Sequence, residues 1–134
     1  MNFRFLRQAV AAVLVVAIFV LSTVFAASPA MAADVSVVMG SKGLKFSPNK
    51  ITASAGDTIT FTIGMAPPHN VVFTDKTPGA KALNTILGDG RKGSSLLRKG
   101  EVVLTIPDDV AAGKYKFACT PHRGAGMIGV LTVE

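Results

Sequence analysis

The sequence predicts an all-β fold, a sandwich of short strands, because polar and apolar residues alternate in short segments separated by turn signals. The clearest segment is residues 58–63, where Ile59, Phe61 and Ile63 share one face and threonines occupy the other. This alternation is typical of a half-buried antiparallel strand. Only residues 79–87 have room for a short helix. Similar strand signals occur at residues 35–39, 50–54, 71–74, 101–106, 114–119 and 128–133.

Length and composition limit the chain to one packed domain and a narrow set of metal sites. It has 134 residues, 49% of them hydrophobic, which suits a single core. It contains one cysteine, two histidines and no tryptophan. Disulfide frameworks, multi-cysteine zinc sites and iron–sulfur clusters are therefore excluded. The phenylalanines after residue 32 lie among apolar neighbours and are expected in the core: Phe46, Phe61, Phe73 and Phe117.

The first 32 residues have the composition of an export signal. Two arginines precede an apolar run over residues 9–25, and Ala30–Ala32 has the small-x-small pattern that signal peptidases accept. The sequence thus predicts a cleaved signal peptide over residues 1–32 and one functional domain over residues 33–134. A retained membrane anchor is the alternative, because about 17 to 20 apolar residues can span a bilayer. The cleavage pattern favours removal.

The charge of the remaining chain restricts its partners. Residues 33–134 contain 12 Lys and Arg against 8 Asp and Glu, a net charge of +4. The lysines are dispersed and not interleaved with aromatic residues, which disfavours nucleic-acid binding. This balance favours encounter with an acidic protein partner.

The predicted strand over residues 114–119 ends in the single cysteine. By strand parity Cys119 points inward, and a lone inward cysteine is most often an inert, small hydrophobic residue. The two faces are Tyr115, Phe117 and Cys119 on one side and Lys114, Lys116 and Ala118 on the other.

The residues that follow this cysteine change its interpretation. Cys119, His122 and Met127 place a thiol, an imidazole and a thioether within nine residues. The other histidine, His69, follows two prolines that stiffen its segment. Two histidines, a cysteine and a weak axial methionine are the ligand set of a blue copper site. The spacing alone does not establish that His69 reaches the same point as the other three.

Two segments carry a resemblance to a known family. They are residues 67–73, Pro-Pro-His-Asn-Val-Val-Phe, and residues 119–129, Cys-Thr-Pro-His-Arg-Gly-Ala-Gly-Met-Ile-Gly, with support from residues 55–58 and 39–41. On these motifs the chain resembles the plastocyanins of cyanobacterial type, within the cupredoxin family of blue copper proteins. The resemblance covers essentially all of residues 33–134.

This resemblance implies a cupredoxin-like Greek-key β-sandwich of about eight strands that binds one type 1 copper, cycling between Cu(I) and Cu(II). The implied ligands are His69, Cys119, His122 and Met127. The family members are soluble electron-transfer proteins and not enzymes. They carry single electrons from cytochrome f to photosystem I in photosynthesis, in the thylakoid lumen. A monomer that does not span the membrane is expected.

Two residues beside these donors are expected to hold the ligand loops together. Asn70 directly follows His69, and Thr120 directly follows Cys119. A side-chain amide can hydrogen-bond the backbone of a neighbouring loop and so restrain both segments.

The resemblance also implies an apolar docking patch around His122. Candidates for this patch are Leu44, Pro68 and Ala125, and Arg123 is expected to assist docking as in the cyanobacterial form.

The chain departs from the family pattern in two places that bear on docking. The residue before the cysteine is Ala118, where the family usually has a tyrosine implicated in partner contact and a second electron route. Residues 75–81, acidic in plant relatives, are basic on balance here. An acidic docking patch is therefore not expected, and Lys76, Lys81 and Arg123 predict attraction to a negatively charged partner.

Other functions remain open on the residues alone. A copper enzyme would need an open coordination position or further ligands, which the two histidines do not supply. A copper-delivery or storage protein is the more serious alternative, although such carriers usually expose several Met or Cys ligands. Met39 and Met65 are expected to be packing residues. A nucleophilic Cys119 with His122 as its base is the remaining possibility.

Overall fold

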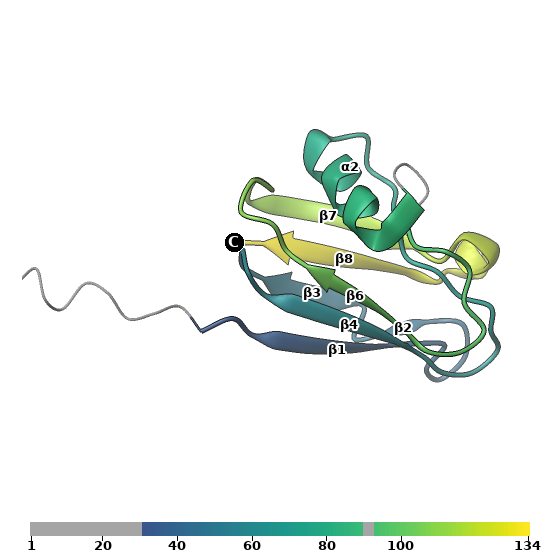
Figure 1. Cartoon of the computed structure of the whole chain (residues 1–134). Coiled ribbons are helices and arrows are strands. Elements are labelled where there is room, and N and C mark those ends of the chain that lie inside the picture. Colours follow the sequence, from purple (N-terminus) through teal and green to yellow (C-terminus); the bar gives the residue numbers. More distant parts are fainter. Residues whose placement is uncertain (1–30, 90–92) are drawn as a thin grey trace, which may run out of the picture. The chain divides into compact units, whose positions relative to one another are not determined.

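The computed structural model describes residues 31–89 and 93–134, so nearly all of the predicted signal peptide, residues 1–32, lies outside the described residues. Within this part of the chain, eight strands form two four-stranded sheets (Figure 1). The all-β sandwich predicted from the sequence is therefore confirmed.

The first sheet has the strand order β2-β1-β4-β6. It contains β1 (Asp34–Met39), β2 (Phe46–Ser47), β4 (Thr58–Ile63) and β6 (Glu101–Thr105). β4 is antiparallel to β6 but parallel to β1. The antiparallel expectation for residues 58–63 is thus right for one neighbour and wrong for the other, because alternation reports burial and not the direction of the partner strand.

The second sheet has the order β3-β8-β7-β5 and carries the loop of interest. It contains β3 (Lys50–Ala53), β5 (Val72–Phe73), β7 (Gly113–Ala118) and β8 (Ile128–Val133). β8 pairs in parallel with β3 and antiparallel with β7, which is in turn antiparallel to β5. The connection between the two central strands, β7 and β8, holds Cys119, His122 and Met127.

The expected helix is present and slightly longer than the sequence suggested. α2 (Pro78–Asn84) continues into η1 (Thr85–Asp89), where Gly88 breaks the helical backbone with φ 119°. The helix begins as its sequence dictates, because the hydroxyl of Thr77 accepts a hydrogen bond from the Ala80 N–H at 3.2 Å and a proline follows it.

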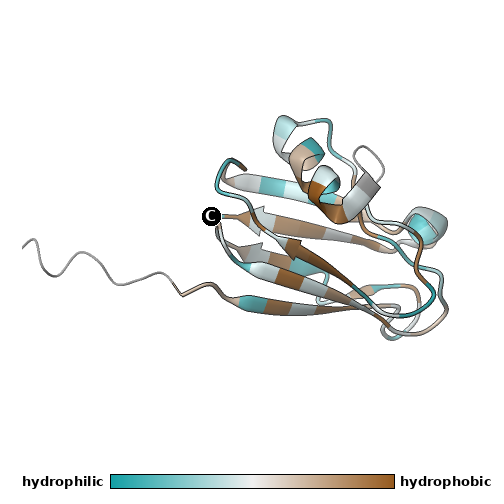
Figure 2. Cartoon of the chain, viewed as in Figure 1, coloured by the Kyte–Doolittle hydropathy of each residue, from teal (hydrophilic) through white to brown (hydrophobic). Residues whose placement is uncertain are grey.

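The core lies between the sheets and is centred on aromatic rings. Phe117 of β7 meets Phe61 of β4 edge to face, with ring centroids 5.8 Å apart, so the two sheets interlock there. Phe46 and Phe73 complete the cluster at 4.9 and 5.7 Å from Phe117. All four rings are at most 3% exposed, which confirms their predicted place in the core. Figure 2 shows the alternation of hydrophobic and hydrophilic segments along the strands that produces this core.

Among residues 31–89 and 93–134, no helix combines the length and the apolar character that crossing a membrane requires.

Candidate metal centre

The loop between β7 and β8 is folded so that its donor residues lie close together. After Cys119 the chain forms a short 3₁₀ helix, η3 (Thr120–Ala125), and reverses at Gly126, where φ is 83°. Cys119 N–H donates to the Met127 carbonyl at 3.1 Å, and Met127 N–H donates to the His122 carbonyl at 3.2 Å. These backbone bonds tie the three donor residues into one compact turn.

His69 reaches this turn from the other side of the site. Its backbone pairs with Leu97 through two hydrogen bonds of 2.9 and 2.8 Å, which fix the segment after the two prolines. Its ring Nε2 lies 2.8 Å from the carbonyl oxygen of Met65, to which it donates. With Nε2 occupied in this way, Nδ1 is the ring nitrogen left free to face the turn.

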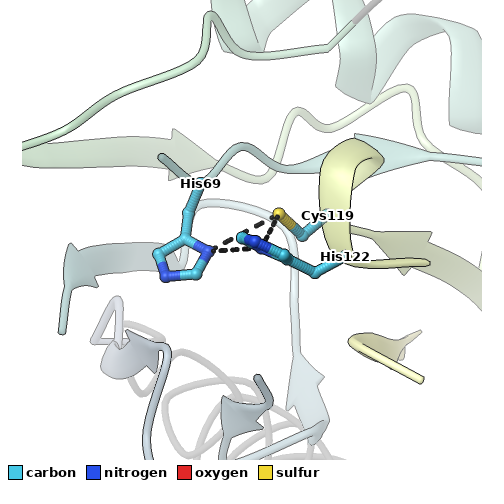
Figure 3. Close-up of side chains that lie close together, drawn as sticks. All are labelled: His69, Cys119 and His122. Atoms are coloured by element: carbon cyan, nitrogen blue, oxygen red, sulfur yellow. Dashed lines mark hydrogen bonds between the residues drawn. The ribbon is translucent and has the colours of Figure 1, made fainter. Parts of the chain in front are cut away.

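The donor atoms of His69, Cys119 and His122 converge on one point (Figure 3). The two Nδ1 atoms are 3.2 Å apart, and Sγ of Cys119 lies 3.6 Å from the Nδ1 of His69 and 3.5 Å from that of His122. All three donor atoms lie within 4.8 Å of one another. The structure therefore brings together the upstream histidine and the loop, which the sequence spacing alone could not establish.

Burial differs among the donors. His69 and Cys119 are 0% exposed, whereas His122 is partly exposed. Met127 is also fully buried, and its backbone hydrogen-bonds to Cys119 and His122. One imidazole thus reaches the surface from an otherwise enclosed cluster.

The thiol of Cys119 depends on its surroundings to ionise. Burial raises the pKa of Cys119, and the backbone N–H groups of Asn70 and His122 lower it in part. The thiolate is the form of cysteine that binds a metal, and a bound soft cation stabilises the thiolate. Two imidazole nitrogens and one sulfur at these distances fit copper well.

Asn70 joins the two segments, as expected. Its Nδ2 donates to the Thr120 hydroxyl at 3.0 Å, and its Oδ1 accepts the Thr120 N–H at 2.7 Å. The two hydrogen bonds connect residues 50 apart in sequence, so the His69 segment and the Cys119 loop are held in register.

Ala118 takes up an unexpected environment for a residue on the outer face. It is 2% exposed, and it is among the residues that line a hollow of about 550 Å³ formed in part by β7 and β8. Lys50, Lys116 and Arg123 are among the residues that line this hollow.

Two exposed apolar residues near the His69 segment were not predicted from the sequence. Met65, expected to be a packing residue, is 65% exposed, so that expectation is wrong, whereas Met39 is fully buried as expected. Leu96 is also 55% exposed, directly before the residue that pairs with His69. Neither position belongs to a periodic segment, so no pattern signalled its exposure.

The candidate docking residues are accessible to different degrees. Ala125 and Arg123 are exposed, and Leu44 and Pro68 are partly exposed. The lysines at positions 76 and 81 are exposed as well. All of these side chains can therefore contact a partner.

Comparison with known proteins agrees with this arrangement. A family model described as copper binding proteins, plastocyanin/azurin family, matches residues 33–134. A plastocyanin of Prochlorothrix hollandica is 39% identical over 98% of each chain, and one of Nostoc punctiforme is 37% identical over 96% of this chain and 94% of its own.

Solved structures agree as well. The oxidized plastocyanin of Dryopteris crassirhizoma has a TM-score of 0.56 and 32% identity, covering 74% of this chain and 99% of its own. The Cu(I) form of an amicyanin mutant has a TM-score of 0.55 and 30% identity, covering 82% of this chain and 90% of its own. The fold is therefore that of the cupredoxins, as predicted. The chain belongs to the plastocyanin/azurin family of copper-binding proteins and is a blue copper electron carrier with one type 1 copper.

Proposed function

We propose that this chain carries single electrons from cytochrome f to photosystem I, using one copper held by His69, Cys119, His122 and Met127. The observation that carries the proposal is the convergence of three donor atoms within 4.8 Å, two of them fully buried. The plastocyanins among its relatives support photosynthetic electron transfer as the setting.

Each residue has a distinct part in this proposal. Copper supplies the redox couple, alternating between Cu(I) and Cu(II). His69 is held by its bond to the Met65 carbonyl, and the loop donors are held by their own backbone bonds. Because these supports involve both sides of the site, the donors keep nearly the same positions in both oxidation states, which favours fast transfer.

The exposed edge of His122 is the proposed route for the electron. The surrounding surface, with Leu44, Pro68, Ala125 and Arg123, is the proposed docking patch. An apolar contact allows close approach to a partner without strong binding, and a single arginine adds attraction to an acidic surface.

The proposed location is the thylakoid lumen, reached by cleavage of residues 1–32. Support comes from the signal-like composition of this segment and from the family match, which begins at residue 33. The processed chain, residues 33–134, is proposed to act as a soluble monomer.

The test is a visible absorption spectrum of purified residues 33–134, titrated with Cu(II) and then with ascorbate. The proposal requires an intense blue thiolate-to-copper band that saturates at one equivalent, bleaches on reduction and returns on oxidation. A weak or absent band would show that Cys119 and the histidines do not bind copper together. Rapid loss of the copper to a chelator would favour delivery of the metal over electron transfer.

The role of Met127 needs a variant of its own. Met127→Leu keeps the volume and removes the thioether, so it should retain the band but shift its position and the reduction potential, because an axial ligand tunes both. The matched control is Met39→Leu, since Met39 is equally buried in a strand that supplies no proposed ligand. An unchanged potential in the Met127 variant would remove this residue from the ligand set.

A further inference from the structure

Asp57 is a buried carboxylate whose recorded partners carry no charge. It is 8% exposed. Its Oδ2 accepts the Ser54 N–H at 2.7 Å, and its Oδ1 accepts the Ala33 N–H, also at 2.7 Å. Two amide dipoles therefore stabilise this anion in place of a cation.

Ala33 is the residue at which the chain enters the fold. Its carbonyl accepts the Thr58 N–H at 2.9 Å, and β1 starts at the next residue. Immediately before it, Ala32 is exposed and Met31 is 89% exposed. Among the described residues, Ala33 is thus the first that forms a hydrogen bond, and it is also the first residue that the predicted cleavage would leave.

We propose that hydrolysis of the peptide bond between Ala32 and Ala33 creates an α-ammonium group that forms an ion pair with Asp57. The reaction consumes one water: the Ala32 carbonyl carbon gains an oxygen and leaves as a carboxylate, and the Ala33 nitrogen gains protons to become an ammonium. The only co-reactant is water, and a signal peptidase is the catalyst. The inference rests on the proposed cleavage of residues 1–32.

Cleavage at this bond changes the chemistry of a contact that already exists. Before cleavage the Ala33 nitrogen is a neutral amide with a single N–H. After cleavage both partners are charged, and hydrogen bonds between two charged groups are stronger than those with one neutral partner. Asp57 is 8% exposed and Ala33 is exposed, so the pair is partly buried and solvent screens it less than a fully exposed pair.

The ion pair requires both groups to be charged, and this sets its pH range. Backbone hydrogen bonds from Ser54 and Ala33 lower the pKa of Asp57, so the carboxylate remains charged until the solution is strongly acidic. A carboxylate in contact raises the pKa of an α-ammonium above its unfolded value of about 7.7–8.0. The stabilisation is thus present from the strongly acidic range in which Asp57 becomes protonated up to about pH 7.7, and it is lost as the pH rises through the raised pKa of the ammonium.

Other charged groups at this end of the sandwich do not replace the ammonium. Most are acidic and so favour a cation here. By element they are Asp34 on β1, Asp108 and Asp109 after β6, Glu134 after β8, and the cation Lys114 on β7.

The test compares two copper-loaded chains that differ by one residue. One begins at Ala33 and the other at Ala32, which moves the ammonium one residue away while keeping the Ala33 N–H. At pH 7 the chain that begins at Ala33 should have an unfolding equilibrium constant about two- to fivefold smaller in urea titrations. This advantage should decrease as the pH is raised from 7 to 10. Equal stability of the two chains at pH 7 would overturn the proposal.

Two controls separate the ion pair from other effects of the terminus. Asp57→Asn should abolish the difference between the two chains, whereas Asp108→Asn, which removes an exposed charge at the same end, should preserve it. Should Asp57→Asn fail to fold, acetylation of the chain that begins at Ala33 serves instead. It keeps the N–H and removes the charge, and should lower stability to that of the chain beginning at Ala32. A difference that persists after acetylation would overturn the ion pair.

The location of the cleavage is tested separately, by the mass of the exported protein. The mass of residues 33–134 supports the proposal, and any other terminus overturns it. The blue band of the copper-loaded chain reports on the proposed electron-transfer function independently, because Asp57 directly precedes β4 and is not among the proposed ligands.

Discussion

Asn70 shows how one side chain can position a metal site without binding the metal. Its two hydrogen bonds to Thr120 connect the segments that supply the proposed ligands. Asn70→Ala should lower the free energy of unfolding by about 1–3 kcal/mol, because it removes both hydrogen bonds between the buried Asn70 side chain and Thr120. It should also speed loss of copper to a chelator, since His69 and Cys119 are then less firmly held together. Chemical denaturation and the decay of the blue band measure the two effects.

The matched variant for this prediction is Thr120→Val. It removes the hydroxyl that Asn70 Nδ2 contacts but keeps the backbone N–H that bonds to Asn70 Oδ1. Its effect should be in the same direction and smaller. If Asn70→Ala lowered stability without changing the rate of copper loss, the residue would stabilise the fold and not the site.

Gly40 controls the orientation of His69 from a turn at the end of β1. Its φ is 85°, and a Cβ here would lie 2.6 Å from Nε2 of His69 and also overlap the Met65 carbonyl. Gly40→Ala should therefore disrupt the bond that orients the imidazole, costing about 1–3 kcal/mol beyond the strain of the positive φ. Gly43→Ala is the control, because Gly43 also has a positive φ, 97°, with open space around it. Equal losses of stability and equal spectra in the two variants would contradict this role.

At the scale of elements, the short strand β5 depends on side chains for half of its hydrogen bonding. β7 pairs with one edge. On the other edge Asn84 of α2 accepts the Phe73 N–H at 2.8 Å and donates to the Phe73 carbonyl at 2.9 Å, as a neighbouring strand would. Ser94 likewise accepts the N–H of Val71. The helix thus covers an edge that would otherwise be exposed.

Asn84→Ala should destabilise the protein by about 1–3 kcal/mol, because it leaves both backbone groups of Phe73 buried and unpaired. Hydrogen exchange at the Phe73 amide should accelerate more than at β4 amides. Thr85→Ala is the comparison, since it removes an exposed hydrogen bond to the Lys81 carbonyl in the preceding turn. Comparable losses in the two variants would show that α2 stabilises the sandwich by packing alone.

The elements also show what local sequence can and cannot specify. The alternation in residues 58–63 defines β4 with its observed bounds, because half-burial dictates a period of two. The two residues of β2 are too few to produce such a period, and this strand was not predicted. The strand predicted at residues 71–74 is shorter in the structure and covers Val72–Phe73, because Val71 pairs with the Ser94 side chain and not with a strand. The alternation does not indicate whether a neighbouring strand is parallel or antiparallel.

At the scale of the whole molecule, the site depends on contacts that no local pattern contains. The sequence could supply the donor types and their order, because few residues offer sulfur or imidazole. The 3.2 Å between the histidine Nδ1 atoms depends on the pairing of His69 with Leu97 and on the Asn70 bonds. These contacts span 28 and 50 residues of sequence, so they follow from the assembled sandwich. The ligand assignment itself stays a prediction until copper is bound.

The net charge of residues 33–134 predicts how the chain associates with the proposed electron donor. With +4 on residues 33–134 and an exposed arginine beside His122, an acidic electron donor should be attracted before contact. The second-order rate of electron transfer from a soluble acidic domain of cytochrome f should fall as salt rises, because ions screen charges beyond about 10 Å at 0.1 M. Stopped-flow absorbance of the blue band measures this rate.

The variant Arg123→Glu tests whether this attraction comes from the surface near His122. It should slow the reaction about two- to tenfold at low ionic strength, with the difference decreasing at high salt, because rim charges act mainly on association. Lys114→Glu makes the same change of charge at the start of β7, the opposite end of that strand from the η3 loop, and should have a smaller effect. Equal slowing in the two variants would mean that total charge, and not the surface near His122, governs encounter. A rate that does not respond to salt in the unmodified protein would exclude steering altogether.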